Sequence, residues 1–146
     1  MDINPQVIIY TDGACEPNPG PGGWAALLRF GRREKTLSGY DPATTNNRME
    51  LTAAVQALQA LDRPCRVDLY TDSEYLRRGI TEWLPGWKQR GWKRKGGALA
   101  NQELWQALEA AAAGQDITWH WIRGHASDRD NQRVDRLARQ AMRERL

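Results

Sequence analysis

The tripeptide YTD occurs twice, and it carries the acids whose type and spacing could support chemistry. One copy ends at Asp12 and the other at Asp72, and each closes a run of β-branched and aromatic residues that is typical of a buried strand. If the two strands are parallel neighbours, both carboxylates leave the sheet at the edge where open α/β sheets place their ligand sites. The repeat therefore predicts a pair of acids at one sheet edge.

Two further acids are predicted to lie near this pair. Glu50 falls on the apolar stripe of a predicted helix, and Asp135 borders the apolar face of the last predicted helix. Carboxylates about 4 Å apart repel by roughly 4 kcal/mol at an effective dielectric constant near 20, so one keeps its proton unless a cation binds. Oxygen ligands suit Mg²⁺ or Mn²⁺, and two such ions can clamp a phosphodiester. The four acids predict metal-dependent phosphodiester hydrolysis.

Each acid also has a simpler explanation when it is taken alone. Asp12 and Asp72 could be turn residues at strand ends, Glu50 an acid that favours a helix N-terminus, and Asp135 a surface charge. These explanations account less well for the repeated strand ending and for an acid on an apolar stripe. We therefore treat the four acids as one candidate site.

The elements that must position these acids follow from apolar patterning, and they indicate an α/β fold. The strand at 6–12 is followed by a Pro- and Gly-rich loop and by two strands, WAALLRF and TLSGY, in a β-meander. A helix from Asn46 to just before Pro64 and a strand at 66–72 imply a crossover and parallel pairing. Helical segments broken at Pro85, Gly91 and Gly96 follow, and then a last strand at 117–122 and a helix at about 130–144.

The whole sequence bounds the class of protein. Its 146 residues, 40% apolar and 27% charged, predict one compact domain over residues 1–146. No apolar run approaches the roughly 18 residues of a membrane span, and the start of the chain lacks a signal pattern, so we expect no membrane contact and a cytoplasmic protein. Cys15 and Cys65 lack metal-like spacing and are expected to be reduced thiols.

Basic residues are unevenly placed although the net charge is only +3. The stretch KQRGWKRK, residues 88–95, holds five basic residues and no acid. Such a run suits a phosphate backbone, and it is equally typical of a solvated helix face or loop.

Six motifs together resemble bacterial ribonuclease H, type 1: TDGAC (11–15), NPGPGGW (18–24), TTNNRMEL (44–51), YTDS (70–73), GHA (124–126) and VDRLA (134–138). The resemblance covers nearly the whole chain except its ends and about residues 94–100. It implies an α/β ribonuclease H-like fold, with a five-stranded mixed sheet of order 3-2-1-4-5 flanked by helices. It also implies an endonuclease, expected to be a monomer, that cuts the RNA strand of RNA/DNA hybrids and removes hybrids and RNA primers during DNA replication and repair.

The resemblance also assigns roles within the catalytic site. One Mg²⁺ ion, held by Asp12 and Asp135, is expected to activate the attacking water; a second, held by Asp12, Glu50 and Asp72, is expected to stabilise the leaving 3′ oxygen. Two ions are expected with substrate, Mn²⁺ is the expected substitute, and the products carry 5′-phosphate and 3′-hydroxyl ends. His125 matches a loop histidine that assists proton transfer or product release, and a pKa near 6.5 suits either role. Without the resemblance, a lone loop histidine is usually just solvated.

Substrate contacts are carried over residue by residue. The family's minor-groove amides match Asn18, Asn46 and Asn47. Its phosphate pocket for the DNA strand matches Thr45 and Asn101. Its tryptophan-lined channel for the same strand matches Trp83 and Trp87. Asn46 could also serve as a helix cap, and Trp105, Trp119 and Trp121 are expected in the core. Glu74 stands where the family commonly has glutamine, and the basic segment KRKGGALAN is shorter and poorer in lysine than in many members, so we expect weaker substrate binding.

Two other functions compete with this interpretation. A nuclease of the same fold that acts on DNA, such as a Holliday-junction resolvase or an integrase-like enzyme, would keep the acidic cluster but not the three groove asparagines. A non-catalytic duplex-binding module would keep tryptophans and basic residues but lose the metal ligands, and all four acids are present here.

Overall fold

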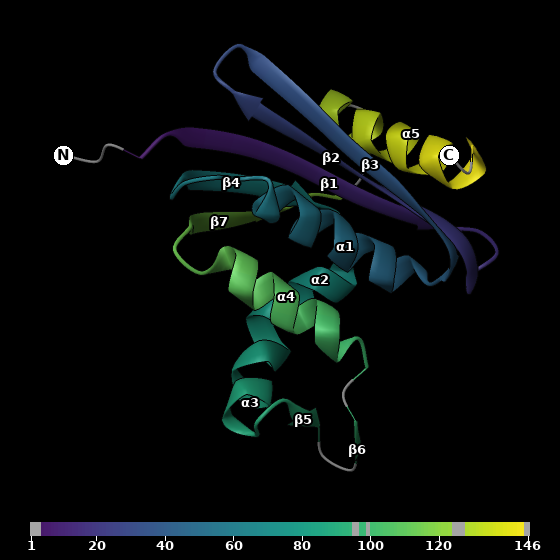
Figure 1. Ribbon diagram of the computed structural model, residues 1–146, viewed down its shortest axis with the longest axis vertical. Coiled ribbons are helices and arrows are strands. Elements are labelled where there is room, and N and C mark those ends of the chain that lie inside the picture. The colour runs from purple at the N-terminus through teal and green to yellow at the C-terminus, as the bar shows by residue number, and fades with distance from the viewer. Residues whose placement is uncertain (1–3, 95–96, 99, 124–127, 145–146) are drawn as a thin grey trace.

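A mixed sheet organises the chain in the computed structural model, which describes residues 4–94, 97–98, 100–123 and 128–144. Its strands lie in the order β3-β2-β1-β4-β7 (Figure 1). In chain order they are β1 (Gln6–Cys15), β2 (Gly20–Phe30), β3 (Arg33–Thr44), β4 (Arg66–Thr71) and β7 (Asp116–Trp121). The first three pair antiparallel, whereas β4 is parallel to both β1 and β7. The predicted α/β class, the meander and the order 3-2-1-4-5 are confirmed.

Helices cover the two faces of the sheet. On one face α1 (Asn46–Gln59) packs on β1 and β2, and α4 (Gln102–Ala112) packs on α1. On the opposite face α5 (Arg129–Glu144) packs on β1, β2 and β3 (Figure 1). The remaining short elements are α2 (Glu74–Arg78), the π-helical segment η1 (Gly79–Trp83), α3 (Leu84–Gln89), β5 (Lys93–Arg94) and β6 (Gly97–Ala98).

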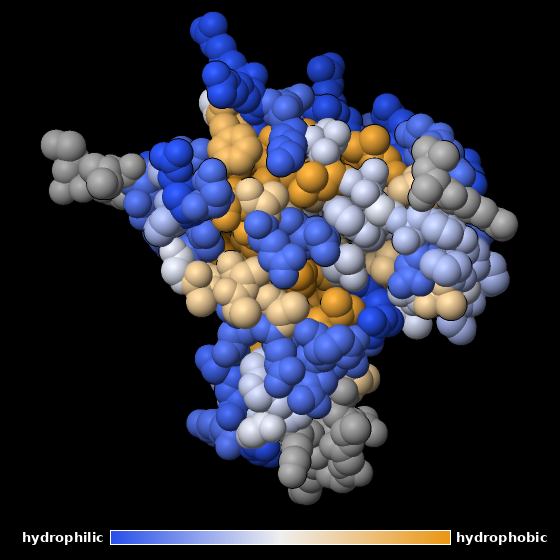
Figure 2. All heavy atoms as spheres, in the orientation of Figure 1, coloured by the Kyte–Doolittle hydropathy of each residue, from blue (hydrophilic) through white to orange (hydrophobic). Residues whose placement is uncertain are grey.

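Each face of the sheet has its own apolar core, as the sequence pattern predicts. The stripe of α1 buries Leu51, Ala54, Val55 and Leu58 against the strands. The other core is smaller and holds Val134 and Ala138 of α5. Figure 2 shows apolar atoms gathered in the middle of the α1 face, with hydrophilic surface above and below. Among the described residues, no helix combines the length and apolar composition that a membrane crossing requires.

One local prediction is wrong. The glycine-rich segment after Pro19, predicted as a loop, begins strand β2. A Cβ at Gly23 would lie 2.3 Å from the carbonyl oxygen of Ala138, so glycine there lets α5 lie directly on the strand. The predicted boundary at Pro85 agrees with the structure, because η1 ends at Trp83 and Pro85 lies in the first turn of α3, where its missing N–H needs no intrahelical partner.

Candidate active site

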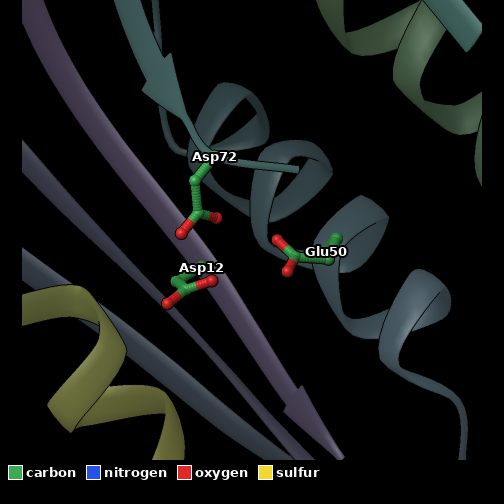
Figure 3. A group of neighbouring side chains, drawn as sticks. All are labelled: Asp12, Glu50 and Asp72. Atoms are coloured by element: carbon green, nitrogen blue, oxygen red, sulfur yellow. The ribbon is translucent and has the colours of Figure 1, made fainter. Parts of the chain in front are cut away.

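Three acids from three elements converge at one edge of the sheet. Asp12 lies in β1 and Asp72 directly follows β4, and these strands pair in parallel with Tyr10 opposite Tyr70. The two acids therefore stand at the same level, as the repeated tripeptide predicts. Glu50 of α1 completes the group, and one carboxylate oxygen from each residue lies within 4.8 Å of the others. Figure 3 shows the three side chains pointing toward one another.

The start of α1 brings Glu50 to the strand. The Thr45 side chain accepts a hydrogen bond from the backbone N–H of Arg48 at 3.2 Å and caps the helix. The helix then passes so close to β1 that a Cβ at Gly13 would lie 2.6 Å from the backbone nitrogen of Glu50. This close approach places Glu50, only 6% exposed, beside Asp12.

Replacing Gly13 by alanine tests the close approach. A Cβ there must push α1 away from β1, so Gly13→Ala should lower the free energy of unfolding by about 1 to 3 kcal/mol and weaken divalent-cation binding by moving Glu50. Urea unfolding and a Mg²⁺ titration measure the two effects. Gly86→Ala is the control, because its Cβ would meet only the flexible end of Arg90. Parent-like stability and Mg²⁺ affinity in Gly13→Ala would show that the approach is not needed.

The electrostatics of the three acids favour a bound cation. Burial, then the charge of Asp72, raises the pKa of Asp12 to about 8, although the Gly13 N–H donates to its carboxylate at 2.9 Å. Burial and the neighbouring Asp12 raise the pKa of Glu50 well above its usual value. Burial also raises the pKa of Asp72, which lies at the rim of the group. Like charges held together out of water are stabilised by a divalent ion.

An unsatisfied oxygen supports the fit to a metal. Oε2 of Glu50 is buried and has no hydrogen-bond partner among the described residues. A buried carboxylate oxygen without a donor is costly, and a cation is one partner that satisfies it. The donor set is all oxygen, which suits hard ions such as Mg²⁺ or Mn²⁺.

Asp135 lies beside the group without joining it. Its charge raises the pKa of Asp12, Glu50 and Asp72, so the fourth predicted acid acts on all three members of the group. Its carboxylate is about half exposed and is paired with Nε of Arg139, one turn later in α5, at 3.2 Å. Arg139 was not predicted from the sequence, although the i, i+4 spacing is a signal for such a pair.

The residues predicted to contact substrate gather around the start of α1. Asn18 accepts a hydrogen bond from the backbone N–H of Asn46 at 3.1 Å, which ties the β1–β2 loop to the helix. Asn46 and Asn47 open α1, and Thr45 caps it. Asn101 accepts from Arg48 at 3.1 Å and donates to the hydroxyl of Tyr75 at 3.0 Å.

Glu74 lies apart from this group, and the predicted catalytic histidine lies outside the described part of the chain. Glu74 is exposed at the start of α2 and lies 3.6 Å from Nη1 of Arg77. Arg48, which sequence reasoning missed, links the predicted phosphate residues Thr45 and Asn101. His125 belongs to residues 124–127, which lie outside the described part of the chain.

Three tryptophans, Trp83, Trp87 and Trp105, form a cluster. Trp83 and Trp87 lie 5.7 Å apart between ring centroids, and Trp87 lies 5.3 Å from Trp105. Trp105 is fully buried, as predicted for a core residue. Trp87 is only 8% exposed, so most of its ring faces the core rather than a ligand. Trp83 is half-buried, with the guanidinium of Arg78 5.1 Å from its ring centroid, and offers more surface.

Known proteins match the chain in sequence and in structure. The family model described as RNase H matches residues 4–143. The ribonuclease H of Halorhodospira halophila is 61% identical over 136 residues, which is 91% of this chain and 90% of the relative. The ribonuclease H of Bradyrhizobium sp. (strain ORS 278) is 57% identical over 140 residues, 95% of this chain and 91% of the relative.

Solved structures agree. LC9-RNase H1, a type 1 RNase H with the type 2 active-site motif, superposes with a TM-score of 0.87 at 36% identity, covering 97% of this chain and 74% of that one. LC11-RNase H1, crystallised in complex with an RNA/DNA hybrid, superposes with a TM-score of 0.69 at 23% identity, covering 93% of this chain and 96% of that one. At that identity the second match establishes the fold alone.

Proposed function

The chain belongs to the RNase H family of nucleases, and we propose that it is an endonuclease that hydrolyses the RNA strand of RNA/DNA hybrids. The observation that carries the proposal is the convergence of Asp12, Glu50 and Asp72, whose carboxylate oxygens lie within 4.8 Å of one another. All three side chains offer carboxylate oxygens, which are the ligands that hard divalent ions prefer.

The chemistry assigned to the site is two-metal hydrolysis. Mg²⁺, or Mn²⁺ in its place, supplies positive charge that activates water and stabilises the leaving 3′ oxygen. We assign Asp12 and Asp135 to the ion beside the water, and Asp12, Glu50 and Asp72 to the ion beside the leaving oxygen. To bind an ion, Asp135 must give up its solvent-exposed ion pair with Arg139, an interaction worth under about 1 kcal/mol. The products carry 5′-phosphate and 3′-hydroxyl ends, and His125 is assigned to proton transfer or product release.

Recognition of a hybrid is assigned to the surface around the start of α1. Amides of Asn18, Asn46 and Asn47 can both donate to and accept from the 2′-hydroxyl that distinguishes RNA from DNA. Their clustering beside the acids supports this assignment. Thr45 and Asn101 are assigned to a phosphate of the DNA strand. Arg48 lies between them as a further hydrogen-bond donor, with its charge paired to Glu103. An ionised Glu74 can only accept hydrogen bonds, whereas a glutamine can also donate them. We therefore expect Glu74 to contact the groove more weakly than a glutamine would.

The tryptophan cluster predicts a separation of binding from stability. Trp83→Ala should weaken hybrid binding by about tenfold, since aromatic stacking is worth about 1 to 3 kcal/mol, with little change in the rate at saturating substrate. Trp87→Ala should lower the free energy of unfolding by about 3 to 5 kcal/mol, because its ring lies in the core. Fluorescence anisotropy and urea unfolding measure the two effects, and Phe30→Ala, at an exposed position, is the control. Unchanged binding in Trp83→Ala would remove this residue from the substrate surface.

A panel of duplexes tests the proposed function against the DNA-nuclease alternative. The same sequence is offered as an RNA/DNA hybrid, as duplex DNA and as duplex RNA, each with Mg²⁺. The proposal expects cutting confined to the RNA strand of the hybrid. Cutting of duplex DNA with the hybrid left intact would replace the proposal by the resolvase or integrase-like function.

The cellular role follows from the chemistry as a further part of the proposal. An enzyme of this specificity removes hybrids and RNA primers during DNA replication and repair. We assign the activity to one catalytic domain over residues 1–146 that acts as a monomer, and cytoplasmic residence stays a prediction.

A further inference from the structure

Tyr75, in the first turn of α2, is a half-buried residue that the assignments above do not use. Its hydroxyl oxygen accepts two hydrogen bonds, one from the side-chain amide of Asn101 and one from the indole N–H of Trp105, each at 3.0 Å. A hydroxyl oxygen has two acceptor positions, so both are in use. Tyr75 thus joins α2 to Asn101, which directly precedes α4, and to the core of α4 (Figure 1).

The position of the Tyr75 hydroxyl is fixed from the core side. The rings of Tyr75 and Trp105 are in contact, with centroids 5.4 Å apart, and Trp105 is fully buried. A Cβ at Gly79 would lie 2.0 Å from Cη2 of Trp105, so the indole fills the space over this glycine. A closely packed ring cannot move without disturbing its neighbours, so the hydroxyl that it contacts keeps one place.

The side-chain amide of Asn101 is held at both of its ends. Its Oδ1 accepts a hydrogen bond from Nη1 of Arg48 at 3.1 Å, and its Nδ2 donates to Tyr75. A guanidinium can only donate, so the amide oxygen must face Arg48 and the amide nitrogen must face Tyr75. The hydrogen bond with Tyr75 uses one of the two N–H groups on Nδ2. The second N–H is the one that the amide can offer to a further acceptor, such as a phosphate oxygen.

We propose that Tyr75 is a positioning residue for the phosphate pocket: its hydroxyl orients the Asn101 amide so that the second N–H donates to a phosphate of the DNA strand. The inference rests on the proposed function, because it takes Thr45 and Asn101 to bind that phosphate. A donor that is oriented in advance lowers the ordering cost of binding. The hydroxyl should therefore act on the affinity for the hybrid and not on the chemical step at the acids.

The first test is Tyr75→Phe, which removes the hydroxyl and keeps the ring, whose centroid lies 5.8 Å from that of Trp83. The dissociation constant of the hybrid in chelator and the KM with Mg²⁺ should both rise about three- to tenfold, the range for one hydrogen bond. The value of kcat should stay within about twofold of the parent, because binding and not the transition state loses the contact.

Two control variants separate this effect from other losses. Tyr40→Phe removes a hydroxyl from β3 where the strand faces α5, on the opposite side of the sheet from α1. Val67→Ala removes core packing near the start of β4 and so lowers stability without touching Asn101. Both variants should keep the parent KM and the parent affinity for the hybrid at temperatures below their thermal midpoints.

The second test locates the phosphate. Each phosphate of the DNA strand is replaced in turn by an uncharged methylphosphonate, and the affinity of the hybrid is measured for the parent and for Tyr75→Phe. In the parent, one position should weaken binding more than its neighbours do. In Tyr75→Phe this extra effect should shrink by the factor that the variant itself loses in affinity, because groups in contact couple and distant groups add.

Every outcome decides the proposal. A parent-like KM and dissociation constant in Tyr75→Phe overturn it. An affinity loss that is the same at every substituted phosphate also overturns it, because a general loss of structure would give that pattern. A parent that binds the hybrid through this phosphate but leaves the RNA strand intact with Mg²⁺ refutes the proposed function and leaves the role of Tyr75 standing.

Nuclear magnetic resonance of the parent decides the proposal if Tyr75→Phe does not fold. Addition of the hybrid in chelator should shift one side-chain amide proton of Asn101, the one that meets the phosphate, more than the proton bonded to Tyr75. Two amide protons that keep their positions when the hybrid binds would overturn the proposal.

Discussion

Replacing Asp12 by asparagine should reduce metal-dependent cleavage of an RNA/DNA hybrid by at least about a thousandfold, or about 4 kcal/mol of transition-state stabilisation. Asp12 is the acid that adjoins all the others, because Asp72 and Asp135 both raise its pKa and Glu50 lies in the same group. Asparagine keeps the shape of the side chain but removes the charge that two ions would share. Single-turnover cleavage with saturating enzyme measures the loss directly.

Hybrid binding separates this effect from a loss of structure. Asp12→Asn should bind the hybrid within about threefold of the parent, because phosphate and groove contacts supply most of the affinity. Asp62→Asn, which changes an exposed carboxylate outside the acidic group, is the matched control. It should change neither the cleavage rate nor the affinity for the hybrid. Cleavage by Asp12→Asn at the parent rate would remove Asp12 from the metal site.

Stability without metal should fall as the pH rises from about 4 to about 8. The folded protein holds Asp12 with a pKa of about 8, whereas the unfolded chain releases that proton near its ordinary pKa of 3.8. The folded state thus binds more protons in this window, and each pH unit favours unfolding. Glu50 and Asp72, whose pKa values are also raised, act in the same direction. The combined loss should reach at least about 3 kcal/mol at pH 8.

Urea unfolding in chelator at pH 5.5 and pH 8 measures the loss. Mg²⁺ at pH 8 should restore much of it, because the ion binds the folded state alone. Asp12→Asn should flatten the profile and be more stable than the parent at pH 8. Paired acids such as Glu34 and Asp68, whose pKa values are lowered by Arg29 and His120, act oppositely and lose stability only toward lower pH. A metal-free stability that rises between pH 5.5 and 8 would contradict the like-charge account.

The predictable part of the site is the part that depends on periodicity. Strand alternation and the repeated tripeptide predicted that Asp12 and Asp72 share an edge, and helical spacing predicted that Glu50 faces the sheet. The helical period also predicted that Asp135 lies at the border of the apolar face of α5. It did not predict the pair with Arg139, because the period sets the direction of a side chain and not the rotamer that it takes.

The unpredicted part depends on contacts between residues far apart in the chain. Arg48 gains its neighbour Asn101 only when α4 packs on α1. The glycines before Trp24 resemble a loop because nothing local reveals the helix that lies against them. No periodic pattern carries such information, so these features required the tertiary structure.

Cleavage of an RNA/DNA hybrid labelled at the RNA 5′ end, with Mg²⁺ and then with excess chelator, tests the central claim most directly. The account predicts internal cuts in the RNA strand with Mg²⁺, products ending in 3′-hydroxyl groups, and no cutting in chelator until Mg²⁺ or Mn²⁺ is returned. Cutting that continues unchanged in chelator would contradict a catalytic metal at Asp12, Glu50 and Asp72, and an intact hybrid at saturating Mg²⁺ would contradict the proposed substrate.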